Sequence, residues 1–224
     1  MSGFATEVSA VLFDLDGTLL DSAPDLASAA NSMRQARGLP AISPELYRPH
    51  SSSGARGMLK VAFGVTPADE QFDGLKREFF EVYQGCLAEQ TRPFAGVDRL
   101  IAGLTSASLP WGVVTNKAER FTGPVMRAMS SLAGAGTVVS GDTTPYAKPH
   151  PEPLLEAARR LGRSAHSCIY VGDDLRDIQA GRAAGMQTVA VLYGYLGEGA
   201  DVPAWGADHV ISMPEDLLNL LGLP

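Results

Sequence analysis

The 224-residue sequence contains only two cysteines, Cys86 and Cys168, and neither sits at a spacing typical of a metal site. We therefore expect two free, buried thiols and no disulfide framework. No apolar run approaches the ~18 residues that a membrane span requires. Residues 1–7 hold no basic segment followed by an apolar one, so no secretory signal is expected. Together these absences favour a location in the reducing cytoplasm.

Basic residues are also in the minority. The formal net charge is −7, from 18 Lys and Arg against 25 Asp and Glu, and no basic stripe is present. Nucleic acid and anionic membranes are therefore poor partners on electrostatic grounds. Length and composition are those of an ordinary globular protein, either one large domain or a core with a modest insertion.

Short apolar runs that alternate with helical patterns predict an α/β fold. Buried strands are expected at residues 8–13, 111–115, 137–140, 167–171 and 188–192, with a shorter sixth at 209–211. Helices are expected at residues 95–107, 119–129, 151–161 and 174–184. Strands that alternate with helices pair in parallel, so the sequence predicts a doubly wound parallel sheet.

The segment between the first strand and residue 95 breaks this rhythm. It shows helical patterns at residues 23–37, 59–63 and 72–86, and no convincing strand between residues 19 and 92. We expect a helical cap domain here, with hinges at residues 19–22 and 91–96. The predicted domains are a core of residues 1–18 and 96–224 and a cap of residues 19–95. Alternatively, these helices simply extend the core.

Two aspartates, Asp14 and Asp16, directly follow the first predicted strand in the segment Asp-Leu-Asp-Gly-Thr. Strand side chains alternate, so both carboxylates point the same way. Two like charges this close repel each other. A fold tolerates such a pair when a cation lies between them, or when one carboxyl holds a proton for chemistry. The pair therefore indicates a metal-assisted active site.

Other polar residues follow the remaining strands. Because ligands bind beyond the carboxyl ends of parallel strands, we interpret these residues as one site. They are Thr115 and Asn116 after the second strand, Lys148 after the third, and Asp173, Asp174 and Asp177 after the fourth. Taken singly, each has a plainer interpretation. Thr115 is then a strand-end residue, Lys148 a solvated lysine, and the aspartates favour a helix N-terminus.

As a set, these motifs resemble those of the haloacid dehalogenase (HAD) superfamily. The resemblance rests on Asp-Leu-Asp-Gly-Thr at residues 14–18, Thr115, Lys148-Pro149, and Gly172-Asp173-Asp174 with Asp177, which occur in the family's order. It covers nearly the whole chain and implies a Rossmann-like core. The helical insertion resembles the type-one cap of phosphoglycolate phosphatases. The implied activity is Mg²⁺-dependent hydrolysis of a small phosphate ester.

The resemblance also implies a role for each motif residue. Asp14 is the nucleophile that forms an aspartyl-phosphate, and Asp16 is first the acid and then the base. Thr115 and Lys148 hold the phosphate oxygens. The expected Mg²⁺ ligands are Asp14, the backbone carbonyl of Asp16, and Asp173.

Two further aspartates are assigned supporting roles by the same resemblance. Asp177 is expected to support the metal's waters and to orient Lys148. Asp174 either supports the site from behind the ligands or caps a helix.

The predicted cap contributes candidate substrate-binding residues. Ser53, Gly54 and Arg56 lie in a loop that, in this cap type, faces the active site, and Asn116 is expected beside them. Arg56 matches the geometry of a substrate carboxylate, although a solvated arginine is an equal alternative. Lys117 and Arg120 are weaker candidates.

The substrate is expected to be phosphoglycolate-like. The alternative is N-acetylmuramic acid 6-phosphate, because other segments of this chain resemble phosphatases that cleave it in cell-wall recycling. A phosphomutase shares all the core motifs and ranks lower. A 2-haloacid dehalogenase lacks the second aspartate, so Asp16 argues against it. A binding protein with a dead site is expected to have lost Asp14 or Asp16. A monomer or a homodimer is expected.

Overall fold

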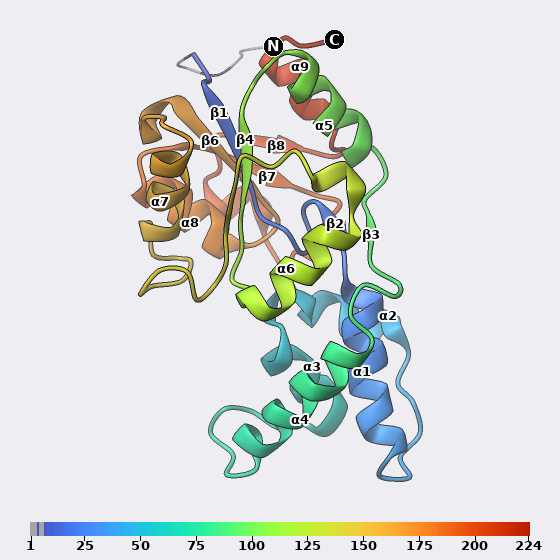
Figure 1. Cartoon of the computed structure of the whole chain (residues 1–224). Helices are drawn as coiled ribbons and strands as arrows, with labels where there is room; N and C mark the ends of the chain where they lie inside the picture. The colour runs from blue at the N-terminus through green and yellow to red at the C-terminus, as the bar shows by residue number, and fades with distance from the viewer. Residues whose placement is uncertain (1–3, 5–6) are drawn as a thin grey trace.

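The computed structural model describes Phe4 and residues 7–224, and six parallel strands form its central sheet (Figure 1). The strand order is β5-β4-β1-β6-β7-β8, with parallel pairing at every step. The bounds are β1 Ala10–Phe13, β4 Trp111–Val114, β5 Thr137–Val139, β6 Cys168–Gly172, β7 Gln187–Val191 and β8 His209–Ile211. The predicted doubly wound parallel sheet is confirmed, and each strand lies within two residues of its expected bounds.

Helices cover both faces of this sheet, as Figure 1 shows. One face carries α5 (Val97–Ser106), α6 (Glu119–Ala128) and α9 (Asp216–Leu221), and the other carries α7 (Glu152–Arg160) and α8 (Leu175–Ala183). Alternation along β1 explains the two layers. Val11 and Phe13 pack into the first apolar cluster, whereas Ala10 and Leu12 pack into the second. A strand buried on both faces reads as a continuous apolar run, which is why no polar alternation marks it.

A separate group of helices lies beyond the carboxyl ends of the strands (Figure 1). We call α1 to α4, residues 23–85, the helical insertion. Its elements are α1 (Ala23–Gln35), α2 (Pro44–Tyr47), the 3₁₀ segment η1 (Arg48–Ser53), α3 (Ala55–Phe63) and α4 (Phe72–Gly85). They bury an apolar cluster of their own, which includes Met33, Tyr47 and Phe79. Phe121 of α6 joins this cluster, so the insertion packs against the core layer.

Two short strands connect the insertion to the sheet, where the sequence predicts no strand. β2 (Leu20–Asp21) pairs antiparallel with β3 (Arg92–Pro93). The expectation was wrong here because a two-residue ladder leaves no alternating pattern to detect. The Asp25 carboxylate strengthens the junction by accepting hydrogen bonds from Gln90 N at 2.8 Å and Thr91 N at 3.0 Å. The exact division into core and cap domains stays a prediction.

The two cysteines form no disulfide. Cys168 is buried, while Cys86 is only half-buried, so the expectation of two buried thiols was right for one of them. Burial raises the pKa of the Cys168 thiol to about 11. This thiol is therefore protonated near neutral pH and is a poor nucleophile.

Within the part of the chain that the structure describes, no helix combines the length and the apolar character needed to cross a bilayer.

Candidate active site

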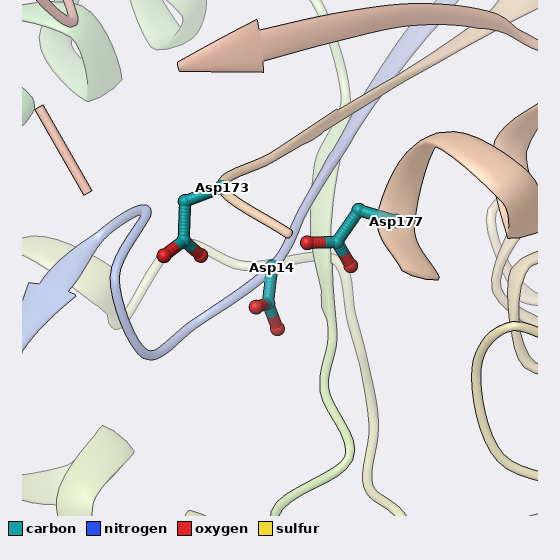
Figure 2. A group of neighbouring side chains, drawn as sticks. All are labelled: Asp14, Asp173 and Asp177. Atoms are coloured by element: carbon teal, nitrogen blue, oxygen red, sulfur yellow. The ribbon is translucent and has the colours of Figure 1, made fainter. Parts of the chain in front are cut away.

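Three carboxylates meet at the carboxyl edge of the sheet. Asp14 directly follows β1, Asp173 directly follows β6, and Asp177 lies in the first turn of α8. Each offers an oxygen, and these oxygens lie within 4.8 Å of one another. Figure 2 shows the carboxylates of Asp14, Asp173 and Asp177 turned towards a common space. Among the described residues, the side chain of Asp16 is not part of this cluster, and the expected role of its backbone carbonyl stays a prediction.

The cluster is electrostatically costly. Burial raises the pKa of Asp14 to about 7, and Lys148 only partly offsets this effect. Burial, together with the nearby charges of Asp14 and Asp177, raises the pKa of Asp173 well above its usual range. The hydrogen bonds to Asp173 come from neutral donors, including Tyr195 N at 2.8 Å. Such buried, crowded carboxylates are expected where a cation binds.

These residues suit a magnesium ion by their chemistry. Every candidate ligand atom in the cluster is a carboxylate oxygen, the type that Mg²⁺ prefers. The small number of protein ligands is usual for this ion, which keeps several waters. We propose that Asp14 and Asp173, with the backbone carbonyl of Asp16, would hold it.

Lys148 is buried inside this acidic cluster. Its Nζ donates to Asp14 Oδ1 at 2.7 Å, to Asp177 Oδ1 at 2.8 Å, and to Tyr170 OH at 2.8 Å. Its side chain is only 3% exposed, so the interpretation as a solvated lysine is excluded. Burial by itself lowers the pKa of a lysine, but the two carboxylates outweigh this effect and the net shift is upward. Lys148 therefore presents a fixed positive charge next to the Asp14 carboxylate.

Asn116 holds the backbone of Lys148. Its side-chain amide donates to the carbonyl oxygen of Lys148 at 3.0 Å, and its Oδ1 accepts from the amide of Lys148 at 2.9 Å. The hydroxyl of Thr115 accepts from the amide of Lys117 at 3.1 Å. Substrate binding by Asn116 stays a prediction, and the hydrogen bonds described here also position the backbone of Lys148.

Asp16 is paired with a lysine that the sequence ranked low. Lys117 Nζ lies 3.0 Å from Asp16 Oδ1 and 3.2 Å from Asp16 Oδ2, and it donates to Tyr83 OH at 2.8 Å. The hydroxyl of Ser22, at the start of the insertion, also donates to Asp16. The Asp16 carboxylate is thus held from the core by Lys117 and from the insertion junction by Ser22.

Asp174 caps helix α8. Its carboxylate accepts from Arg176 N at 2.9 Å, while Asp177 Oδ2 accepts from Asp174 N at 3.0 Å, which is a reciprocal capping box. The helix-cap alternative raised from the sequence is therefore observed. The guanidinium of Arg176 binds Asp174 and also donates to the Ser52 carbonyl at 2.8 Å, which joins α8 to the insertion. No sequence motif pointed to Arg176.

Gly17 allows the chain to pass close to Asp173. Its φ is +91°, and a Cβ built there would lie 2.2 Å from Asp173 Oδ2. Only glycine combines that conformation with that clearance. The following residue, Thr18, donates its hydroxyl to Asp173 Oδ1 at 3.3 Å.

A cavity of about 520 Å³ opens between the strand ends and the insertion. Its floor includes Asp14, Asp16, Thr115 and Lys148. The insertion supplies Ser53, Gly54 and Arg56, along with an apolar wall that includes Phe72, Phe79 and Phe80. The predicted catalytic residues and the predicted insertion residues therefore face the same cavity, and the buried Asp173 lies beside Asp14.

Comparison with known proteins is consistent with this geometry. The chain is 42% identical, over 96% of its length and 95% of the relative, to N-acetylmuramic acid 6-phosphate phosphatase of Pseudomonas aeruginosa. It is 45% identical, over 93% of its length and 94% of the relative, to phosphoglycolate phosphatase of Xanthomonas campestris pv. campestris.

A solved structure has the same overall arrangement. The crystal structure of a predicted phosphoglycolate phosphatase from Haemophilus somnus superimposes with a TM-score of 0.83 at 27% identity, covering 97% of this chain and 99% of that one. Residues 11–191 match the haloacid dehalogenase-like hydrolase family, and this span includes every motif described above. The chain therefore belongs to the haloacid dehalogenase-like hydrolases.

Proposed function

We propose that the protein is a Mg²⁺-dependent phosphomonoesterase that works through an aspartyl-phosphate on Asp14. The observation that carries this proposal is the arrangement around Asp14. One oxygen of its carboxylate is bound by Lys148 at 2.7 Å, while Asp16 and two further buried acids lie on the same sheet edge. A nucleophile, an acid, a fixed ammonium and a cation site are what hydrolysis of a phosphate monoester requires.

The first half-reaction transfers the phosphoryl group to the protein. A carboxylate oxygen of Asp14 attacks phosphorus, and the bond to the ester oxygen breaks. Asp16 donates a proton to that departing oxygen, so the product alcohol leaves neutral.

The second half-reaction restores the enzyme. Asp16, now a carboxylate, accepts a proton from water as the water oxygen attacks phosphorus. The bond to Asp14 breaks, inorganic phosphate leaves, and both aspartates return to their starting protonation states.

Charge on the phosphoryl oxygens is the main barrier to this chemistry. Uncatalysed hydrolysis of phosphate monoesters needs up to ~10²¹-fold acceleration, and general acid–base catalysis supplies only ~10²–10⁴ of it. Lys148 and the hydroxyl of Thr115 are therefore proposed to bind the phosphoryl oxygens. A bound Mg²⁺ supplies further neutralisation of that charge. Asp177 fixes the Lys148 ammonium at 2.8 Å.

The substrate is proposed to carry a carboxylate and to be larger than a two-carbon acid. The cavity volume of about 520 Å³ lies within the range of ~300–1,000 Å³ typical of drug-sized ligands. Its wall of Phe72, Phe79 and Phe80 offers apolar area that phosphoglycolate does not fill. These features favour N-acetylmuramic acid 6-phosphate, with Arg56 proposed to bind the carboxylate. Phosphoglycolate is the second candidate, because a relative of that name is 45% identical.

The test is a comparison of phosphate release from the two esters, with Mg²⁺ and with excess chelator. We expect kcat/KM to be at least about tenfold higher for N-acetylmuramic acid 6-phosphate, which corresponds to about 1.4 kcal/mol of additional transition-state binding. A higher value for phosphoglycolate would overturn the substrate assignment and leave the reaction intact. Full activity in chelator would overturn the metal role. Conversion of a sugar phosphate to its isomer without phosphate release would identify a phosphomutase instead.

We also propose a cytoplasmic location and a monomeric or homodimeric state. The support is the net charge of −7 and the two unpaired cysteines. Cell fractionation and light scattering coupled to size-exclusion chromatography test the two statements separately.

A further inference from the structure

We infer that Tyr83 of the helical insertion is a positioning residue for Asp16 and acts through Lys117. This inference rests on the proposed function, in which Asp16 protonates the leaving oxygen. It adds a contact between the insertion and Asp16, which is made by Tyr83 and Lys117, two residues outside the predicted motifs.

Three side chains form a continuous chain of contacts. Tyr83 OH accepts from Lys117 Nζ at 2.8 Å, and the same Nζ contacts both carboxylate oxygens of Asp16, at 3.0 and 3.2 Å. Tyr83 belongs to α4 in the insertion, whereas Lys117 follows β4 and Asp16 follows β1. The contact therefore crosses from the insertion to the core and ends on the proposed acid.

These three side chains are largely buried in the wall of the cavity. Tyr83 is 2% exposed, and the side chain of Lys117 is 8% exposed. A buried ammonium is costly unless it is paired and its donors are satisfied. Lys117 has three N–H donors, and they engage the Asp16 carboxylate and the Tyr83 hydroxyl. Removing that hydroxyl leaves one N–H of Lys117 without its acceptor. It also removes one of the contacts that fix the direction of the Lys117 side chain.

The ring and the hydroxyl of Tyr83 have different tasks. The ring stacks on Phe79 with centroids 6.0 Å apart and contacts Phe121 at 5.3 Å, within the apolar cluster of the insertion. The hydroxyl is the part that reaches Lys117. A Tyr83→Phe substitution therefore keeps the packing and removes only the polar link.

The consequence for catalysis depends on the leaving group. An ester with a poor leaving group needs proton donation in the transition state, whereas p-nitrophenolate departs readily without it. A misdirected Asp16 should slow the first class of ester more than the second. The parameter kcat/KM reports only the steps up to formation of the aspartyl-phosphate, so the later role of Asp16 as a base does not enter it.

The experiment measures kcat/KM for phenyl, p-chlorophenyl and p-nitrophenyl phosphate, which have similar size and graded leaving groups. The variants are Tyr83→Phe and, as a second break in the chain, Lys117→Met. The matched control is Tyr47→Phe, which removes a hydroxyl from another buried tyrosine of the insertion, where it donates to Asn31 Oδ1 at 3.1 Å, away from the cavity.

We expect the ratio of phenyl to p-nitrophenyl kcat/KM to fall about tenfold in Tyr83→Phe, a part of the ~10²–10⁴ that a general acid contributes. Lys117→Met should lower this ratio at least as far, and Tyr47→Phe should leave it at the wild-type value. An unchanged ratio in Tyr83→Phe would overturn the inference, as would an equal loss on all three esters, which is the mark of a purely structural role. If Tyr83→Phe does not fold, the ratio in Lys117→Met decides. Failure of the proposed function is distinct, because wild-type protein would then release no phosphate from any ester.

Discussion

Lys148 Nζ lies 2.7 Å from Asp14 Oδ1, although the two residues are 134 positions apart in the sequence. The contact engages one oxygen of the Asp14 carboxylate, so the group has a fixed direction and its second oxygen is left to react. Asp14 and Lys148 each follow a strand of the parallel sheet, and the carboxyl ends of those strands meet at one edge.

Replacing Asp14 by asparagine should abolish turnover. An amide oxygen is a poor nucleophile, so we expect kcat for phosphate release to fall roughly 10³-fold or more. Folding should be retained, because the change removes one of several crowded buried charges. Phosphate release and thermal unfolding measure the two effects. Asp98→Asn, at an exposed position in α5, is the matched control and should keep wild-type activity. Wild-type activity in Asp14→Asn would remove Asp14 as the nucleophile.

Magnesium affinity should rise with pH. Burial raises the pKa of Asp14 to about 7, so without a bound cation this carboxyl is mostly protonated below that pH. A cation must displace this proton, and its apparent affinity therefore falls as the pH drops through 7. The proton on Asp14 alone makes Kd about tenfold higher at pH 6 than at pH 8, and Asp173, whose pKa is also raised, can only increase this ratio. Calorimetric titration with MgCl₂ at both values measures it. The same affinity at both values would contradict a role for Asp14 in binding the ion.

Gly17→Ala should damage the cation site more than the fold. The new Cβ would lie 2.2 Å from Asp173 Oδ2, so Asp173 must move. We expect a loss of about 1–3 kcal/mol in the free energy of unfolding and at least about tenfold weaker Mg²⁺ binding, the size typical of disturbed metal-site support.

The control for this substitution is Gly38→Ala. Gly38 also has a positive φ, +68°, but nothing lies within 4 Å of an added Cβ. It therefore carries only the backbone cost of about 1 kcal/mol that both substitutions share, and Mg²⁺ binding should be unaffected. Chemical denaturation and calorimetry separate these outcomes. Equal Mg²⁺ affinity in both variants would contradict the steric argument.

Arg56→Ala should weaken recognition of a substrate carboxylate. Arg56 lines the cavity from the start of α3. We expect KM for an acidic ester to rise about tenfold, since a charge-assisted hydrogen bond contributes roughly 1.5–3 kcal/mol. KM for p-nitrophenyl phosphate should stay near the wild-type value. Lys60→Ala, at an exposed position further along α3, serves as the control. Equal changes for both esters would remove Arg56 from the recognition role.

The motif residues were predictable because their positions follow from the strands. Asp14 and Asp173 each come directly after a buried apolar run, and the ends of parallel strands converge on one edge. The buried lysine was predictable for a related reason. Lys148 follows β5 and precedes α7, which places it on the same edge. Of its four partners, Asp177 was expected from the family resemblance, and the other three came only from the tertiary structure.

The contacts between the insertion and the core were not predictable. Tyr83 reads in the sequence as one more apolar position on a helix, and nothing in its spacing reveals that its hydroxyl reaches Lys117. Arg176 is similarly unmarked, yet it donates to the Ser52 carbonyl across the junction. The hydrogen bonds of Asn116 were not predictable for the same reason, because bonds to the backbone of Lys148 depend on the path of a distant loop.

Local sequence was sufficient to determine the order of strands and helices and the acids that follow them, because periodicity and strand-end chemistry are short-range properties of the chain. Only the folded arrangement decided which cation faces which acid, since Lys117 and Lys148 both follow strands and yet pair with different aspartates, Asp16 and Asp14. That choice depends on the direction of each side chain. Tyr83 of the insertion helps to direct Lys117, whereas Tyr170 and Asp177 of the core direct Lys148.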